Sequence, residues 1–170
     1  DGTVVSTNST YSFTATEDRT LVANFIARYT VTLISNPTGA GTLVGAGTYD
    51  DGSSVTLTAV AATGYVFSDW TENGVAIATT STCEITVTSD RDITANFIPL
   101  YTISLSVNPE NSGTVTGAGT YTSGTQRTVR ATANAGYEFG SWTENGEVVS
   151  TESTYIFTLS ANRTLVANFT

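Results

Sequence analysis

The stretch Gly64-Tyr-Val-Phe-Ser-Asp-Trp70 recurs as Gly136-Tyr-Glu-Phe-Gly-Ser-Trp142, 72 residues further along a chain of 170 residues. The same offset, without insertion or deletion, links the phenylalanines Phe25, Phe97 and Phe169. Repetition at this scale is the signature of an array of small folding modules, and arrays supply reach, spacing or multivalency more often than chemistry. We therefore expect the function to reside in the repeat.

Hydrophobic and polar side chains alternate in segment after segment, as in residues 29–33 and 57–61. A period of two places successive side chains on opposite faces of a sheet, so these segments are expected to be strands. Between them, the Gly-rich stretch 39–52 predicts an irregular excursion that ends in a turn. No segment has a sustained helical period, although residues 61–64 or the surroundings of Asp69 could hold a single helical turn. The sequence thus predicts tandem, essentially all-β modules.

Turn signals mark the connections inside each module. Asn73-Gly74 and Asn145-Gly146 predict two-residue hairpins, because both central positions of a type I′ turn need a positive φ, and Asp1-Gly2 stands at the same place in the first copy. Trp70 comes three positions after Phe67 and breaks the alternation. A bulge or short turn is therefore expected to re-aim the indole.

The period divides the chain into residues 1–25, 29–97 and 101–169, joined by very short linkers such as 98–100. The last two ranges are expected to be full modules, with limited bending between them. Residues 1–25 match only the closing part of a module, so they are expected to belong to a truncated repeat. Alternatively, the true unit is permuted and the orphan half lies near 145–170. In either case we expect the orphan hairpin to pack on an adjacent module or on a neighbouring chain.

Composition argues against several function classes. The formal charge is −9, and the chain has six Arg, no Lys and no His. No basic surface is available to follow nucleic-acid phosphates, so nucleic-acid binding is not expected. The sequence has no apolar run of 18 or more residues, so insertion into a membrane within this segment is not expected. Without His or Lys, and with one Cys, the chain cannot assemble catalytic Ser-His-Asp or Cys-His sets or ordinary zinc sites. We therefore expect no enzyme activity, no cofactor and no metal.

Three local features of the sequence are candidates for catalysis, metal binding or thiol chemistry. Asp69 and Glu72 are the best pair of carboxylates for a glycosidase, but Asp69 is replaced by serine in the next copy, which favours a solvated loop edge. The turn at residues 50–52 offers two aspartates for calcium, but both are lost in the next copy. The single cysteine, Cys83, is best explained as a core residue.

Aromatic residues give the strongest alternative function. Trp70, Trp142, Tyr49 and Tyr121 could stack on sugar rings and form a carbohydrate-binding platform. A small sheet also needs a large apolar side chain in its core, which is the favoured interpretation of the two tryptophans. For Tyr49 and Tyr121, in their Gly-rich loops, the two interpretations stay open.

The pattern resembles the divergent internalin-type B-repeats, or Listeria–Bacteroides repeats, of bacterial surface proteins. The resemblance covers the whole chain and rests on a fixed order of short motifs in both copies. In the first full copy these are Tyr29 to Leu33, Gly45 to Tyr49, Gly64 to Trp70, Asn73-Gly74, and Ile93 to Phe97.

The resemblance implies a small module related to the β-grasp fold, repeated in extracellular, cell-surface or wall-attached proteins. It implies a stalk, spacer or adhesion role and offers no catalytic residues to carry over. The expected partners are adjacent repeats of the same chain and a host or bacterial surface glycan or protein.

Overall fold

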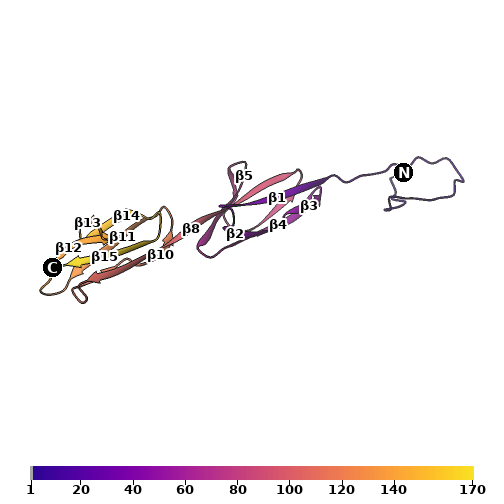
Figure 1. The fold of residues 1–170 in the computed structure, drawn as a ribbon. Coiled ribbons are helices and arrows are strands. Elements are labelled where there is room, and N and C mark those ends of the chain that lie inside the picture. The colour runs from indigo at the N-terminus through magenta and orange to yellow at the C-terminus, as the bar shows by residue number, and fades with distance from the viewer. Residues whose placement is uncertain (1) are drawn as a thin grey trace.

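A computed structural model describes residues 2–170, and all of its regular structure is β-strand. The prediction of an all-β chain is confirmed, since the described residues contain no helix. Two modules lie end to end along an elongated molecule, and the N-terminal segment extends away from the first of them (Figure 1).

The first module consists of seven strands and the first half of an eighth. Their bounds are β1 Arg28–Asn36, β2 Gly41–Val44, β3 Gly47–Asp50, β4 Ser53–Ala61, β5 Tyr65–Glu72, β6 Val75–Ala78, β7 Thr82–Val87 and β8 Arg91–Asn108. They form a five-stranded sheet in the order β6-β5-β8-β1-β3 and a three-stranded sheet in the order β2-β4-β7. The three-stranded sheet, rather than a helix, covers the core side of the larger one.

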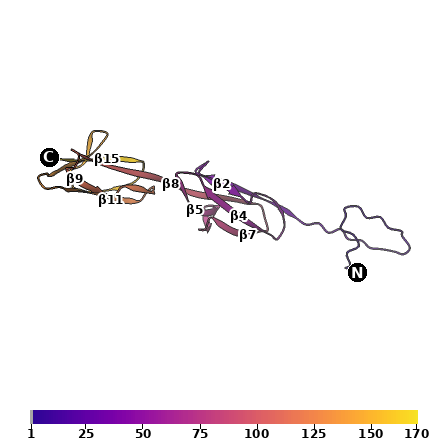
Figure 2. The same ribbon diagram turned by 90° about the horizontal axis from the view of Figure 1, so that it is seen from below.

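The second module repeats this plan with the second half of β8. Its other strands are β9 Gly113–Thr116, β10 Gly119–Thr122, β11 Gln126–Ala133, β12 Phe139–Glu144, β13 Glu147–Ser150, β14 Thr154–Thr158 and β15 Arg163–Phe169. The larger sheet runs β13-β12-β15-β8-β10 and the smaller sheet runs β9-β11-β14. Since β8 enters both larger sheets, the two modules share one uninterrupted strand (Figure 2).

Each module has its own hydrophobic core between its two sheets. In the first core, Leu57 of β4, Ile93 of β8 and Trp70 of β5 belong to one hydrophobic cluster, and all three residues have 0% exposure. Phe67 packs edge-on against Phe97 with ring centroids 5.7 Å apart. Burial of alternate residues on both sheets explains why the period-two pattern predicts the strands so well.

The predicted hairpins and bulges are present. Asn73 and Gly74 have φ values of 51° and 79° and connect β5 to β6, as a type I′ turn requires. Asn145 and Gly146 repeat this turn with φ values of 51° and 86°. The register between β5 and β8 shifts between Phe67 and Asp69, which is the irregularity expected before the tryptophan. The turn expected at Asp1-Gly2 lies partly outside the described residues.

The Gly-rich stretch 39–52 is not irregular, contrary to expectation, because it contains the strands β2 and β3. Its alternation is hidden by glycines at the inward positions. A Cβ atom on Gly41 would overlap the ring of Phe97 and lie 2.7 Å from the carbonyl oxygen of Val60. Only glycine fits at this inward position beside the aromatic ring, so the sequence of the strand lacks the hydrophobic residue that would mark the alternation. The helical turns considered at 61–64 and Asp69 are also absent: the first is a tight turn and Asp69 lies in β5.

The N-terminal segment, residues 2–27, differs most from expectation, because it forms no strand and does not pack on the adjacent module. Residues 2–25 are identical to 146–169 at 17 of 24 positions, including the whole of Arg19–Phe25. Yet Phe25 is 92% exposed, whereas its counterpart Phe169 is 4% exposed. In a complete module this closing strand pairs with a parallel opening strand, and the described chain offers the segment no such partner.

Candidate functional site

Both tryptophans lie in the module cores and not on a surface. Trp70 and Trp142 each have 0% exposure. The Trp142 Nε1–H donates to the carbonyl oxygen of Ser153 at 3.4 Å, whereas the buried Nε1–H of Trp70 has no hydrogen-bond partner. A stacking platform needs an accessible ring face, so neither indole is available to a sugar in this structure.

Tyr49 and Tyr121 are half-buried, and each hydroxyl is used inside its own module. The Tyr49 hydroxyl donates to the carbonyl oxygen of Gly45 at 3.0 Å. The Tyr121 hydroxyl lies 3.0 Å from the carbonyl oxygen of Ala118, and the guanidinium of Arg127 covers its ring at 3.8 Å from the centroid. In both modules, the tyrosine hydroxyl is thus hydrogen-bonded to a backbone carbonyl of the Gly-rich stretch that precedes it. The structure therefore gives the two tyrosines a local structural role and does not bring them together with the tryptophans.

The carboxylates considered for catalysis do not face one another as an acid–base pair. Glu72 forms a bidentate ion pair with Arg91, with N–O distances of 2.5 and 2.6 Å and side chains that are each 20% exposed. The hydrogen bond from Arg91 to Glu72 raises the pKa of the guanidinium above its ordinary value. Asp69 instead accepts hydrogen bonds from Ser68 at 2.5 Å and from Asn96 at 2.8 Å. Both carboxylates are therefore already engaged by partners within their own module.

The remaining candidates for ligand chemistry also have structural partners. Asp50, one of the two aspartates of the turn at residues 50–52, forms an exposed ion pair with Arg28 at 3.0 Å. Within residues 2–170, no group of three or more His, Cys, Asp or Glu side chains is placed to hold a metal ion. Cys83 is half-buried against the first core, and burial raises the pKa of its thiol.

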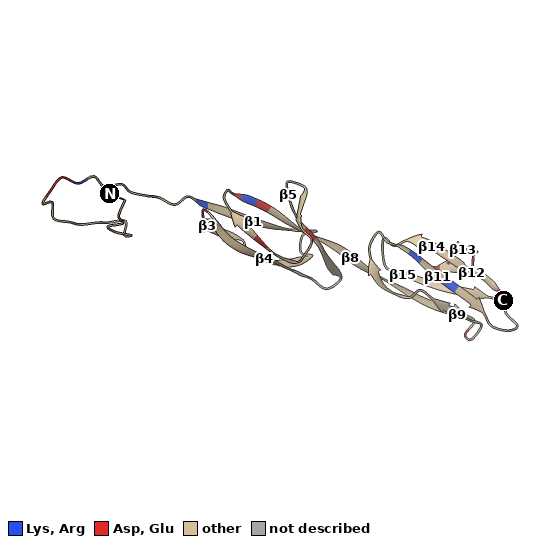
Figure 3. Ribbon diagram, turned by 180° about the vertical axis from the view of Figure 1, so that it is seen from behind, with Lys and Arg blue, Asp and Glu red and all other residues tan. Residues whose placement is uncertain are grey.

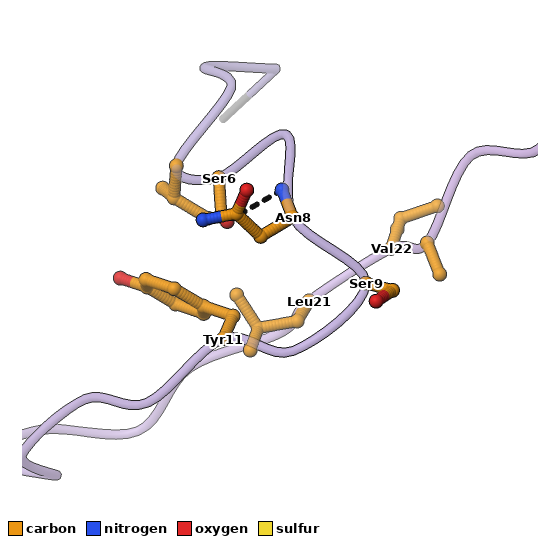
Figure 4. Close-up of a pocket in the computed structure, with 8 residues that line it drawn as sticks. Ser6, Asn8, Ser9, Tyr11, Leu21 and Val22 are labelled. Carbon is orange, nitrogen blue, oxygen red and sulfur yellow. Dashed lines mark hydrogen bonds between the residues drawn. The ribbon is translucent and has the colours of Figure 1, made fainter.

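The N-terminal segment, rather than a module, contains the hollow drawn in Figure 4. The hollow is lined by Tyr11, Leu21 and Val22 among others, and Ser6 accepts a hydrogen bond from the backbone N–H of Asn8 at 3.0 Å. Val22 is 75% exposed, and no lining residue is buried. A hollow between open loops of this kind provides no enclosed site with converging polar groups.

The joint between the modules is the feature with the clearest functional geometry. Residues 98–100, expected to be a linker, lie in the middle of the 18-residue strand β8. The backbone N–H of Leu100 donates to the carbonyl oxygen of Gly64 in the first module at 2.8 Å, and the N–H of Ser123 in the second module donates to the carbonyl oxygen of Pro99 at 2.8 Å. Each module therefore holds the joint from its own side.

Sequence reasoning missed a set of polar side chains that connect the first and last strands of each module. Asn36 donates to Asn96 at 2.9 Å, and Asn108 donates to Asn168 at 3.1 Å. These asparagines recur at the 72-residue offset in the sequence. That recurrence at polar, strand-end positions was the only signal that could have identified them.

A scan against protein families matches the divergent InlB B-repeat domain at residues 29–99 and 103–170. The chain belongs to this family. The two divergent InlB B-repeats correspond to the two modules: the first match ends within β8, and the second ends one residue after β15. The family is a repeat domain of bacterial surface proteins and is not a known enzyme family. No curated protein matches the chain.

The surface of these B-repeats is weakly charged and predominantly acidic. Residues 29–100 carry seven acidic side chains and one Arg, and residues 101–170 carry five acidic side chains and three Arg. The charged residues are sparse and scattered over the strands (Figure 3). Residues 2–170 contain no helix that is long and apolar enough to cross a membrane.

Proposed function

We propose that this chain is a non-enzymatic spacer, in which tandem B-repeats form a stalk that presents other parts of an extracellular bacterial surface protein. The observation that carries the proposal is the shared strand β8, which belongs to the sheets of both modules. At about 3.3 Å per residue, its 18 residues extend about 60 Å. A strand that is hydrogen-bonded on both sides of the joint resists bending in a way that a flexible linker does not.

The path of the chain supports the same function. The chain enters the first module at Arg28 and leaves it along β8 toward the second module (Figures 1 and 2). Since entry and exit lie at opposite ends, each added module adds length. A fold with adjacent termini would instead place successive modules in a cluster around the joint.

The sequestered aromatic residues also favour a spacer over a sugar-binding module. Both indoles are buried, and both candidate tyrosine hydroxyls are hydrogen-bonded within their own loops. A role in adhesion would then depend on what the stalk carries, or on weak contacts multiplied over many repeats.

The spacer is tested by measuring distance distributions between spin labels at Thr56 and Thr128, which are exposed and occupy equivalent positions in the two modules. The labels are attached to cysteines introduced at these sites in a Cys83→Ala background. We expect one narrow distribution. Insertion of Gly-Ser-Gly-Ser after Pro99 should broaden it, whereas the same insertion in the exposed loop after Thr79 should not. A wild-type distribution as broad as that of the joint insertion would refute the spacer proposal.

A further inference from the structure

The first and last strands of each module are direct, parallel neighbours. In the first module, β1 pairs with β8 over six aligned positions, from Val31 opposite Arg91 to Asn36 opposite Asn96. In the second module, β8 pairs with β15 over six aligned positions, from Ile103 opposite Arg163 to Asn108 opposite Asn168. Neighbouring segments in most of the fold are antiparallel, so this parallel ladder is a distinct element of the design.

This arrangement decides how a module responds to tension. A stalk under tension pulls the beginning of β1 toward the N-terminus and the end of β8 toward the C-terminus. Because the two strands are parallel neighbours, the pull slides one along the other and loads all six positions of the ladder together. An antiparallel hairpin pulled from its two ends would instead open one pair at a time.

Side chains fasten both ends of the ladder. At the entry end of the first module, the Asp90 carboxylate accepts a hydrogen bond from the backbone N–H of Thr30 at 2.7 Å. At the exit end, Asn36 donates to Asn96 at 2.9 Å. The second module repeats both bonds.

In the second module, the Asn162 side-chain oxygen accepts from the N–H of Thr102 at 2.8 Å, and Asn108 donates to Asn168 at 3.1 Å. A charged aspartate and a neutral asparagine thus perform the same bond at the entry end. What the two modules keep in common is an oxygen acceptor aimed at the opening strand.

Ion pairs also connect the closing strand of each module to its other neighbour in the sheet. Arg91, the first residue of β8, is anchored to Glu72 of β5, and Arg163, the first residue of β15, is anchored to Glu144 of β12 at 2.6 Å. The inward side chains of these strands are buried, with Ile93 and Leu165 at 0% exposure, so water reaches the ladder from one face only.

We propose that the parallel terminal strands of each module form a mechanical clamp, so that the chain bears tension in addition to setting distance. Load passes from the clamp of the first module along β8 directly into the clamp of the second. This inference deepens the proposed spacer function, since tension arises where a stalk connects a cell to something it holds.

The clamp is tested by single-molecule force spectroscopy on the full chain, pulled in two directions. Cysteine handles at Ala27 and Thr170, both exposed, load the two ladders in shear. Handles at Ala27 and Ser89 lie at the same end of the first ladder and unzip it. The native Cys83 is replaced by Ala in both proteins, so that only the pulling direction differs. We expect two unfolding steps in shear, at forces several-fold above the unzipping step, because forced unfolding follows the barrier along the pulled direction. Equal forces in the two directions would overturn the clamp.

A pair of variants tests the side-chain fastening. Asp90→Ala removes the acceptor for the Thr30 N–H and should lower one of the two shear steps while the other stays unchanged. Asp92→Ala removes an exposed carboxylate two residues further on, in β8, that makes no side-chain hydrogen bond or ion pair in the structure, and should leave both steps unchanged. Equal effects of the two substitutions would overturn the role of Asp90.

The spacer and the clamp can fail separately. A narrow label distribution together with equal forces in the two pulling directions would leave a rigid spacer without a clamp. A broad distribution together with a strong dependence on pulling direction would leave load-bearing modules on a flexible joint.

Discussion

Gly41 on β2 provides the sharpest test of how the core is packed. Substitution with Ala would place a Cβ atom in the ring of Phe97 and 2.7 Å from the carbonyl oxygen of Val60. Phe97 is 5% exposed and packs edge-on against Phe67, so its ring has no free space to move into. The Val60 carbonyl belongs to the β2–β4 ladder and cannot shift without breaking it.

The expected loss of stability follows from these contacts. Overpacking a core costs about 1–3 kcal/mol, and the smaller entropy of the unfolded Ala chain offsets about 0.4–1 kcal/mol of this. A net loss of about 1–2 kcal/mol is a large part of the roughly 3–5 kcal/mol that a core of this size supplies. Gly113→Ala should act in the same way on the second module, because its Cβ would overlap the ring of Phe169 and lie 2.6 Å from the Thr132 carbonyl oxygen.

Urea unfolding followed by two-dimensional NMR resolves the two modules. With a slope of about 1 kcal/mol per molar urea, Gly41→Ala should lower the unfolding midpoint of the first module by about 1–2 M. Gly140→Ser is the matched control, because Gly140 has space for a Cβ, with its nearest neighbour at 3.4 Å, and the first module already carries serine at this position. An unchanged or raised midpoint for Gly41→Ala would refute the packing argument.

Three further predictions concern other parts of the chain. Glu72→Gln should destabilise the first module by about 1–3 kcal/mol in urea unfolding, because it leaves the largely buried Arg91 without its charged partner. Asp50→Asn breaks an ion pair whose side chains are more than half exposed, so it should change stability by under about 1 kcal/mol. Equal losses of stability in the two variants would contradict the difference expected between the two ion pairs. Cys83, whose pKa is raised by burial, should react with a thiol reagent at pH 8 more slowly than a free cysteine and regain the ordinary rate in urea, so fast reaction of the folded protein would count against its packing. Residues 2–25 should fold as the closing half of a module when a copy of residues 101–145 is fused ahead of Gly2, with new protected amides in hydrogen exchange as the readout; no gain of protection would show that sequence identity with the second module is insufficient.

Much of the fold follows from local sequence. Alternation within residues 57–61 identifies β4, because one face of this strand packs on the core and the other faces solvent. Asn73-Gly74 identifies its hairpin, since few other dipeptides accept two positive φ values. The offset of 72 residues then transfers each assignment to the second module.

The remainder depends on contacts that local sequence does not encode. The division of each module into two sheets is set by which strands meet across the core, and β2 and β3 are hidden because glycines occupy their inward positions opposite aromatic rings. The closing sequence Arg19–Phe25 reads as a strand but forms none, because a strand requires a partner.

The candidate site was predicted less well than the fold. Residue types identified Trp70 and Tyr49 as candidates, but only the packing shows that the first is fully buried and the second is bonded to its own loop. Residues 98–100 were expected to be a linker because they lie between two copies of the repeat. The Pro99 carbonyl oxygen nevertheless accepts a hydrogen bond from the second module, and β8 continues through Pro99 although proline has no N–H to donate.

Residual dipolar couplings test most directly whether the two modules move as one body. Backbone N–H couplings are measured for the full chain in a dilute aligning medium and fitted separately for residues 29–97 and 101–169. We expect both modules to fit a single alignment tensor, with the relative orientation set by β8. Two tensors of different magnitude and orientation would show that the modules tumble independently and that β8 does not hold them as one body.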